Sequence, residues 1–494
     1  MAVSGQGGPN ERPNILLYCT DQQRFDTIAA LGNSEIRTPH LDRLAAEGAA
    51  FTHAYCQNPV CTPSRASFLT GMYPSANHVI RNGCETYPAS LVDKLISRIM
   101  SDAGYDCGLI GKLHLAGAHN GPENRRDDGF DYFQYSHMPY RYWPDGDSYL
   151  EWVRLQGHDP VDAIDTYDSP GLRVVTPENG WAGLKVPTPG SDNAPPELHQ
   201  TRWCTDKAIE FISQPRERPW FLSVNAFDPH PPSDPPWDYY KRYPPETLSD
   251  PPFRDSDLHR QERLAQVPFA VGPYPLDVIR ARQLKAAYYA MIELIDHEIG
   301  RLLDWLESAG LRENTVIIFT SDHGEALGDH GLVMKGARFY EGLVRVPLLW
   351  SFPAGAKAGL KSDALVELVD IVPTLLEITG LPVPAHVQGR SLLPILTGGA
   401  SPDHHKEFVR CEYFYHSPEG IPAYATMYRD ERWKLVCYHG AGLGELFDLH
   451  NDPHEFDDLW LEPGRDPIRN ELIRRSFEAW TLDMDTGEPQ AWPW

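Results

Sequence analysis

Five short runs rich in apolar residues constrain the fold more than any other feature of this chain. They cover residues 14–20, 105–110, 220–226, 314–320 and 344–351, and each has the length of one strand. The first, third and fourth runs are nearly continuous, which is typical of strands that are covered on both faces of a sheet. We therefore predict an α/β fold with a large mixed, mainly parallel sheet that is flanked by helices.

Polar residues follow two of these runs where the predicted strands end. Asp21 and Gln22 follow the first run, and Asp322 and His323 follow the fourth. Ligands of open α/β sheets bind beyond the carboxyl ends of the strands, where such side chains can converge. A turn explains Asp21 about equally well when that residue is considered alone. Together the four side chains predict a site for one metal ion with mostly oxygen ligands.

The sequence pattern changes near residue 400. Before it, residues 276–308 carry apolar side chains at helical spacing and predict one long amphipathic helix. After it, the chain predicts short alternating strands at 407–415, 423–429 and 432–438. A helix over about 466–482 follows, so this part is typical of a small antiparallel sheet with a helix against it. We therefore predict an α/β domain over 1–399 and a smaller α+β subdomain over 400–494.

The overall charge restricts the partners. The chain has 494 residues and a formal net charge of −25, so nucleic acid and anionic membrane surfaces would repel it. We expect neither as a partner. An anionic substrate would require local cations that overcome the field of the acidic protein.

The cysteines and the first residues bear on the compartment. The eight cysteines form no Cys-x-x-Cys pair and indicate neither a zinc ribbon nor a disulfide framework. The first residues lack a basic start followed by an apolar run, and no stretch approaches transmembrane length. A cytoplasmic location is the expectation.

Residues 58–71, Asn-Pro-Val-Cys-Thr-Pro-Ser-Arg-Ala-Ser-Phe-Leu-Thr-Gly, place a thiol and an arginine at a predicted helix start. Pro63 suits an early helical position because its missing N–H would have no partner there, and Gly71 suits the stop. Free N–H groups at a helix start favour an anion or a thiolate at Cys61. A buried structural thiol is the alternative for any isolated cysteine. Cys61 is the first catalytic candidate, with Arg65 one turn later.

Four basic residues follow other predicted strands or turns. Lys112 and His114 follow the second run, and alternation in an extended segment would point both to one side. His230 stands between prolines, which favour an extended turn that could hold it toward a leaving group. Lys335 lies on a glycine-rich loop. A solvated surface position is the ordinary explanation for each of these residues taken alone.

These strings resemble the signatures of the type I sulfatases of the alkaline phosphatase superfamily. Cys-Thr-Pro-Ser-Arg at 61–65 with Leu-Thr-Gly at 69–71 resembles the segment whose cysteine is converted after translation to formylglycine. Gly-Lys-Leu-His at 111–114, Pro-His-Pro-Pro at 229–232 and Ser-Asp-His-Gly at 321–324 resemble further elements of the family. The resemblance covers almost the full chain and implies a sulfuric ester hydrolase of the arylsulfatase type.

The resemblance implies roles for the residues around the nucleophile. Cys61 would act as formylglycine after modification by a formylglycine-generating enzyme. Arg65 would stabilise the hydrated formylglycine, and Lys112 would contact both the formylglycine and the sulfate. His114 would serve the same nucleophile and take the proton when the sulfate is expelled.

The resemblance implies substrate contacts in the same way. His230 would protonate the leaving oxygen, and Lys335 would support it. Both would contact the substrate, as would Lys112. Asn82 is either a sulfate contact or a turn residue, and the sequence favours neither.

The resemblance also implies one divalent cation bound by Asp21, Gln22, Cys61, Asp322 and His323. His323 stands where many sulfatases have asparagine, as in relatives that include phosphonate and phosphodiester hydrolases. Calcium is the first choice for the metal, with manganese and magnesium as alternatives.

The expected substrate is a sulfate monoester of a small molecule or a saccharide. A phosphonate monoester or phosphodiester hydrolase with the same site is the alternative, and a binding protein without turnover is a third interpretation. The sequence leaves aryl, alkyl and sugar leaving groups open, and it leaves open whether the chain forms a homo-oligomer.

Overall fold

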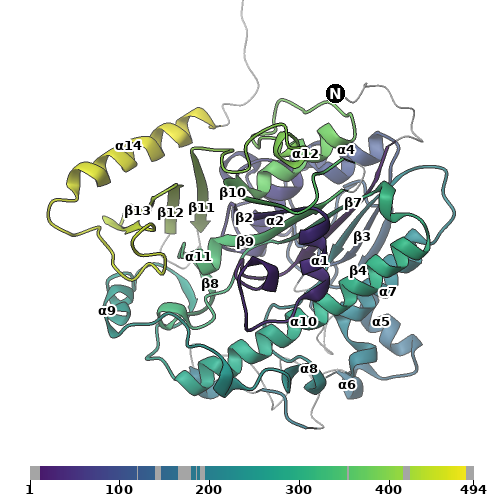
Figure 1. Ribbon diagram of the computed structural model, residues 1–494, viewed down its shortest axis with the longest axis horizontal. Coiled ribbons are helices and arrows are strands. Elements are labelled where there is room, and N and C mark those ends of the chain that lie inside the picture. Colours follow the sequence, from purple (N-terminus) through teal and green to yellow (C-terminus); the bar gives the residue numbers. More distant parts are fainter. Residues whose placement is uncertain are drawn as a thin grey trace, which may run out of the picture.

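A central eight-stranded sheet organises the protein, with strand order β10-β2-β9-β7-β1-β5-β3-β4 (Figure 1). The computed structural model describes residues 12–118, 121–138, 146–164, 180–184, 186–189, 195–352, 355–415 and 423–484. The strands of the central sheet are β1 (Asn14–Thr20), β2 (Ala49–Tyr55), β3 (Asp106–Gly111), β4 (Tyr132–Tyr135), β5 (Trp220–Asn225), β7 (Thr315–Ser321), β9 (Arg345–Ser351) and β10 (Leu360–Glu367). A separate two-stranded sheet pairs β6 (Phe269–Val271) with β8 (Val333–Gly336).

Strand direction confirms the predicted sheet. β9 runs antiparallel to its neighbours β2 and β7, whereas the other pairs of the central sheet are parallel. The mixed, mainly parallel sheet therefore brings the carboxyl ends of β7, β1, β5 and β3, which are consecutive in the sheet, to one edge.

Helices cover both faces of the sheet because the strand residues alternate between two apolar cores. Ile15 and Leu17 of β1 face a core shared with α2 (Cys61–Thr70), α4 (Ile96–Asp102) and α12 (Ile371–Ile378). Leu16 and Tyr18 face the other core, shared with α1 (Pro39–Glu47), α7 (Gln200–Ile212) and α10 (Val278–Ser308). None of the described helices is both long and apolar enough to cross a membrane.

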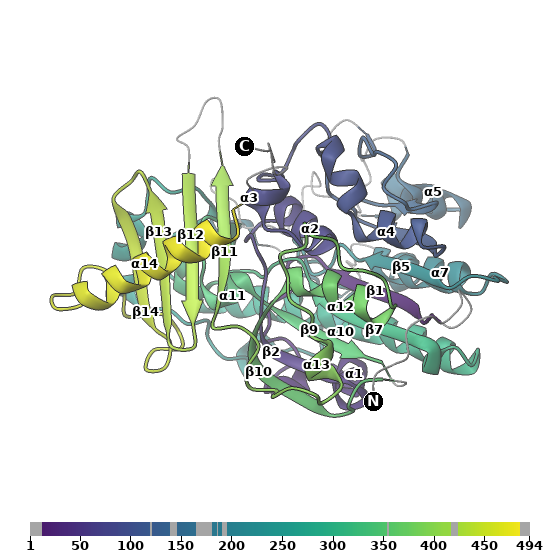
Figure 2. The ribbon, with the colours of Figure 1, turned by 90° about the horizontal axis from the view of Figure 1, so that it is seen from above.

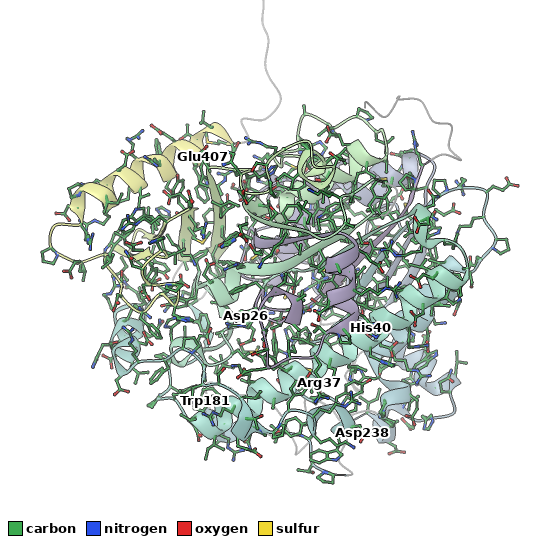
Figure 3. All side chains as sticks on the ribbon, viewed as in Figure 1. Asp26, Arg37, His40, Trp181, Asp238 and Glu407 are labelled. Carbon is green, nitrogen blue, oxygen red and sulfur yellow. The ribbon has the colours of Figure 1, made fainter. Side chains whose placement is uncertain are left out.

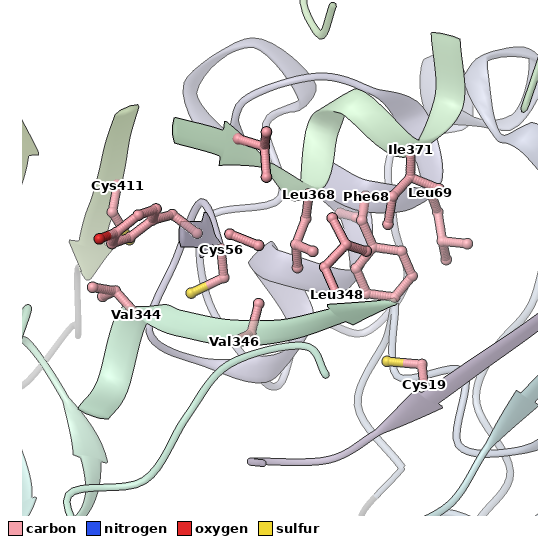
Figure 4. Packing of buried hydrophobic residues seen from close by; sticks show 14 of the residues in the cluster. Cys19, Cys56, Phe68, Leu69, Val344, Val346, Leu348, Leu368, Ile371 and Cys411 are labelled. Atoms are coloured by element: carbon pink, nitrogen blue, oxygen red, sulfur yellow. The ribbon is translucent and has the colours of Figure 1, made fainter. Parts of the chain in front are cut away.

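Shorter helices connect these layers, and side chains fill the space between them (Figure 3). They are α3 (Pro74–Asn77), α5 (Ser148–Leu155), α6 (Pro160–Ala163), α8 (Trp237–Tyr240), α9 (Asp255–Arg263), α11 (Glu341–Val344) and α13 (Leu393–Leu396). α2 is buried along its whole length. Its Phe68 and Leu69 pack with Leu348 of β9, with Leu368 of the 3₁₀ helix over Leu368–Asp370, and with Ile371 at the start of α12 (Figure 4).

A second antiparallel sheet confirms the predicted change of architecture. It contains β11 (Phe408–Tyr415), β12 (Ala423–Asp430), β13 (Trp433–His439) and β14 (Leu443–Asp448) in sequence order. The helix α14 (Asp466–Leu482) lies across its strands (Figure 2). The predicted boundary at 399/400 lies between α13 and β11 and stays a prediction.

Several local predictions were wrong. The segment at 91–103, whose apolar spacing predicts one amphipathic helix, is divided between a 3₁₀ helix over Ala89–Lys94 and α4, because Leu95 has an extended backbone. The segment at 363–381 contains, as α12, the helix that its sequence predicts, but residues 363–367 belong to the edge strand β10. The sequence does not predict strands β2, β4, β6 and β8, and Lys335, which we expect on a glycine-rich loop, lies in β8. Lys112 and His114 follow the end of β3 and are not in an extended segment, since His114 has a φ of 53°.

Lys434 of β13 joins the two parts of the molecule. Its buried Nζ donates to Phe339 O at 2.8 Å and lies 2.7 Å from carboxylate oxygens of both Glu341 and Glu455. Burial acts to raise the pKa of Glu341, but Lys434 and Arg345 outweigh it and lower that pKa. The ammonium group is thus the shared counter-ion of two buried carboxylates.

We expect Lys434→Met to destabilise the protein by about 3–5 kcal/mol, because the change leaves these carboxylates without their shared cation. The measurement is the free energy of unfolding from denaturant titration. Lys361→Met, at an exposed position of β10, is the matched control and should change stability by less than about 0.5 kcal/mol. Equal midpoints for the two variants would contradict the assigned role of Lys434.

Candidate active site

The predicted site residues gather at the sheet edge where β7, β1, β5 and β3 end. Asp322, Asp21 and Lys112 directly follow β7, β1 and β3, and His230 lies in the loop after β5. Cys61 is the first residue of α2 and is 1% exposed. The predicted helix start is therefore confirmed, and Gly71 ends the helix in the left-handed conformation with a φ of 71°.

Four side chains form a buried cluster that is suited to a divalent cation. One potential ligand atom each from Asp21, Cys61, Asp322 and His323 lies within 4.8 Å of the others. His323 Nδ1 lies 2.8 Å from Gly324 O, so this nitrogen carries the proton and Nε2 faces Cys61 Sγ at 3.2 Å. Carboxylate oxygens and an imidazole nitrogen are ligand types that divalent cations use in proteins.

Arg65 holds the cluster together from the next turn of α2. Its Nε donates to Asp322 Oδ2 at 2.8 Å, and Nη2 donates to Asp21 Oδ2 at 3.3 Å. Nη1 donates to the backbone oxygen of Lys112 at 2.8 Å. One guanidinium therefore links α2 to the ends of three strands, and the fixed directions of its donors set the distances between them.

Two lysines that are far apart in the sequence lie near the Cys61 thiol. Lys335 Nζ, from β8, lies 2.9 Å from Cys61 Sγ and donates to Gln22 Oε1 at 2.7 Å. Lys112 Nζ donates to Asp21 Oδ2 at 2.5 Å and lies 4.0 Å from Cys61 Sγ. The site thus concentrates positive charge in an acidic protein.

These charges shift the pKa values of the cluster. Burial and Asp21 act to raise the pKa of the Cys61 thiol, but Lys112, Lys335 and His323 outweigh them and lower it. Burial also opposes ionisation of Asp21, whose pKa is nevertheless held well below its usual range, chiefly by Lys112. For His323 the Asp322 carboxylate outweighs burial and raises the pKa to about 9. The pocket therefore favours an anion at position 61.

Gln22 lies beside the cluster with its carboxamide fixed in direction. Its Nε2 donates to the buried carboxylate of Glu325, which cannot donate in return when it is ionised. Its Oε1 therefore faces the site and accepts from Lys335. The metal-ligand role of Gln22 stays a prediction.

The two predicted histidines flank the site. His230 is 8% exposed, and its Nδ1 lies 2.7 Å from Pro231 O, which leaves Nε2 for the site. Burial and then Lys335 lower the pKa of His230 well below its usual value. His114 is 7% exposed, and burial followed by Lys112 likewise lowers its pKa well below the usual value. Both rings are thus neutral near pH 7.

Asn82 has the contact that its explanation as a turn residue predicts. Its side chain is exposed, and Oδ1 accepts the backbone N–H of Thr62 at 2.9 Å. It therefore satisfies a free donor at the start of α2, as a turn residue can. A contact between its remaining amide group and a substrate stays a prediction.

Sequence reasoning missed three residues that support the site. Glu325 fixes Gln22, Asn225 Oδ1 accepts from Arg65 at 3.3 Å, and Glu123 accepts backbone N–H groups around His114. Glu325 follows Ser-Asp-His-Gly directly, so its place beside the cluster was available as a signal. Glu123 lies in a loop without a comparable pattern.

Protein-family models and known relatives match most of this chain. The family model described as "Sulfatase" matches residues 13–381, and the model described as "N-sulphoglucosamine sulphohydrolase, C-terminal" matches residues 328–480. An arylsulfatase of Clostridium perfringens is 33% identical over 460 residues, covering 91% of this chain and 90% of the relative. A multifunctional alkaline phosphatase superfamily protein of Trinickia caryophylli is 30% identical over 512 residues, covering 95% of each chain.

Among solved structures, the phosphonate monoester hydrolase of Agrobacterium radiobacter is similar throughout. Its TM-score is 0.79 at 25% sequence identity, and the match covers 96% of both chains. The two-sheet architecture is therefore shared with a hydrolase of a related ester.

We expect Asp322→Asn to weaken divalent-cation binding by more than the roughly 10–100-fold that is typical when only an outer partner of a ligand is removed. The change removes a charged ligand but keeps the side-chain volume, so the fold should survive. The measurement is calorimetric titration of the metal-free protein with Ca²⁺, Mn²⁺ and Mg²⁺. Asp238→Asn on α8, where the carboxylate is 65% exposed, is the control (Figure 3). Unchanged affinity in Asp322→Asn would show that the cluster is misassigned.

Proposed function

This chain belongs to the sulfatase family, and from that premise we propose that it cleaves sulfate monoesters with a formylglycine at position 61 and one divalent metal ion. It is a sulfuric ester hydrolase. The observation that carries the proposed mechanism is that Cys61, two lysines and the cluster of possible metal ligands meet at one buried point. Each chemical requirement of ester cleavage has a candidate group there.

Position 61 is proposed to carry the nucleophile. A hydrated formylglycine there would supply one hydroxyl for attack on sulfur and a second that lets the sulfate be expelled without attack by water. Cys61 Sγ stands in for the attacking oxygen, and Lys335 Nζ and His323 Nε2 lie 2.9 and 3.2 Å from it. Lys335 would stabilise the negative charge of an ionised hydroxyl, whereas His323 Nε2 would serve as a metal ligand. A formylglycine-generating enzyme is the proposed modifying partner.

The proposed metal ligands are Asp21, position 61, Asp322 and His323, with Gln22 as the fifth candidate. Bound there, a divalent cation would lower the pKa of the attacking hydroxyl and spread the charge of the sulfate oxygens. Oxygen-rich ligands favour Ca²⁺ and leave Mg²⁺ as an alternative, and the imidazole of His323 adds the softer Mn²⁺.

Three cationic side chains are proposed to act at the site, two on the sulfate ester and one on the groups that surround it. Lys112 and Lys335 would contact nonbridging or leaving oxygens, and Arg65 would hold the carboxylates and the hydrated position 61 in place. A sulfate monoester carries one negative charge, and this local positive charge offsets the repulsion expected from the acidic protein.

His230 is proposed to protonate the leaving oxygen. Its Nδ1–H is held by Pro231 O, so the transferable proton has to reside on Nε2. Because the ring is neutral in the free site, it would take up this proton as the anionic ester binds. The buried position keeps bulk water from competing for the leaving oxygen.

Hydrolysis of phosphonate monoesters or phosphodiesters is the second candidate function. The similar structure from Agrobacterium radiobacter is a phosphonate monoester hydrolase, and these esters also carry a single negative charge. Sulfur and phosphorus esters of equal charge present nearly the same geometry to the cations of the site. We propose these esters as side activities of the sulfatase site.

We expect kcat/KM for an aryl sulfate to exceed that for the matched phosphate monoester by roughly a hundredfold or more. The phosphate monoester carries nearly two charges at neutral pH, and the extra charge in a desolvated pocket costs on the order of a few kcal/mol. The matched phosphonate monoester should lie between them. Cys61→Ser from the same purification measures the background.

The same comparison separates the two candidate functions. A preference for the phosphonate monoester over the sulfate would make the second candidate the main activity. A preference for the phosphate monoester would contradict the charge argument for both. Peptide mass spectrometry of residues around position 61 in the active enzyme should find formylglycine, and fully active protein with only cysteine there would overturn the proposed nucleophile.

We expect His230→Asn to act mainly on esters with poor leaving groups. For an alkyl sulfate, kcat/KM should fall about 10²–10⁴-fold, because the departing alkoxide needs the proton. For a nitrophenyl sulfate the loss should be much smaller, since that oxygen leaves readily as an anion. His297→Asn, at an exposed position of α10, is the matched control. Equal losses for both esters would argue against proton transfer by His230.

A further inference from the structure

A single buried carboxylate holds the loop that carries His114. Glu123 is 5% exposed and lies between β3 and β4. Its Oε1 accepts the backbone N–H of His114, and its Oε2 accepts those of Leu115 and Ala116 at 2.9 and 3.1 Å. Three consecutive backbone donors therefore converge on one side chain, which gives these buried N–H groups their partners.

The backbone at His114 needs such a support. Its φ of 53° lies in the left-handed region, which a residue with a side chain adopts only where the surroundings hold it there. The neighbouring Gly111, with a φ of 91°, cannot accept any side chain, because an added Cβ would lie 2.0 Å from Asn225 O. The chain thus turns sharply between Gly111 and His114, and Glu123 closes this turn.

His137 extends the support from the backbone to the ring. The ring centroids of His114 and His137 lie 4.4 Å apart at an angle of 89°. His137 Nδ1 lies 3.9 Å from Glu123 Oε1. Burial lowers the pKa of His137 to about 4, so near pH 7 it packs against His114 as an uncharged ring. The same residue, Glu123, therefore lies against both the backbone and the aromatic neighbour of His114.

We propose that Glu123 is a positioning residue that, with His137, directs His114 for the half of the reaction in which sulfate leaves residue 61. The inference rests on the proposed function. In that step the proton of the unsulfated hydroxyl passes to His114, and its electron pair forms the carbonyl bond. The carbon–oxygen bond to the sulfate breaks, and sulfate leaves with the bonding pair. A misplaced His114 would slow this step and leave the preceding attack on sulfur largely unchanged.

Glu123→Gln is the informative substitution because it keeps the shape of the side chain and replaces one of its two acceptor oxygens with a donor. A carboxylate offers only acceptors to the three N–H groups, whereas a carboxamide replaces one acceptor with an NH₂ group that would face a backbone donor. We expect the steady-state rate with a nitrophenyl sulfate to fall about 10–100-fold. Rapid mixing should show an initial burst of nitrophenol, and at steady state most of the residue-61 peptide should carry sulfate by mass spectrometry.

His114→Ala provides the signature for comparison. It should give the same burst and the same sulfate occupancy, and the double variant should be no slower than His114→Ala alone, because both changes remove one function. Glu123→Asp keeps the acceptors but shortens the reach, so it should recover part of the rate and lower the occupancy. This variant also serves if Glu123→Gln does not fold.

Glu412→Gln is the matched control. Glu412 is also fully buried, and its carboxylate accepts the N–H and the hydroxyl of Ser75 at 2.8 and 2.9 Å, away from His114. It should lower stability without a burst. The inference about Glu123 would be overturned, and the proposed function left intact, by either of two results. One is a sulfate occupancy in Glu123→Gln equal to that of the wild type, and the other is a double variant whose rate loss is the product of the two single losses. A wild-type enzyme that neither carries formylglycine nor turns over the sulfate would instead overturn the proposed function.

Discussion

The ion pairs of Arg65 are the interaction on which the rest of the site depends. Two carboxylates, Asp21 and Asp322, are completely buried at the ends of adjacent strands, where each would repel the other. The guanidinium contacts both and also the backbone after β3, so its planar array of donors fixes three strand ends relative to α2. Burying these charges is costly, and the cost is offset only while the geometry of the network is kept. The rigid sheet beneath it provides that geometry.

The second sheet contributes to the same site at a distance. Lys335 comes from β8, and the chain from β8 to β9 passes through α11, where Glu341 is paired with Lys434 of β13. Tyr340, just before α11, likewise donates to Glu445 of β14 at 2.9 Å. The C-terminal part therefore braces the segment that follows Lys335. This arrangement explains why a small subdomain without catalytic candidates of its own packs so closely on the larger one.

Strands that are buried on both faces could be predicted from the sequence, whereas β10 at the edge of the central sheet could not. β1 is buried at every position and has the predicted bounds, because its continuous apolar run can be recognised locally. The sequence of β10, Leu-Lys-Ser-Asp-Ala-Leu-Val-Glu, does not alternate between polar and apolar residues. Its apolar side chains stand at 360 and 364–366, a spacing that also suits a surface helix, so the sequence gives no clear strand signal. In the site, Asp21 and Asp322 could be placed because parallel strands bring their ends together. The support from Glu123 could not, since it depends on a turn whose backbone angles leave no periodic trace.

The complete burial of α2 constrains when the proposed modification of Cys61 could take place. Cys61 is 1% exposed, and the helix behind it is packed between β9, α12 and the ends of the central strands. An enzyme that oxidises this cysteine would have to reach its thiol, and the folded protein exposes only 1% of the residue. Conversion would then have to precede the assembly of the sheet. Protein molecules that fold before conversion would keep an unmodified thiol at position 61. The fraction of formylglycine in a preparation would then reflect the relative rates of folding and of oxidation.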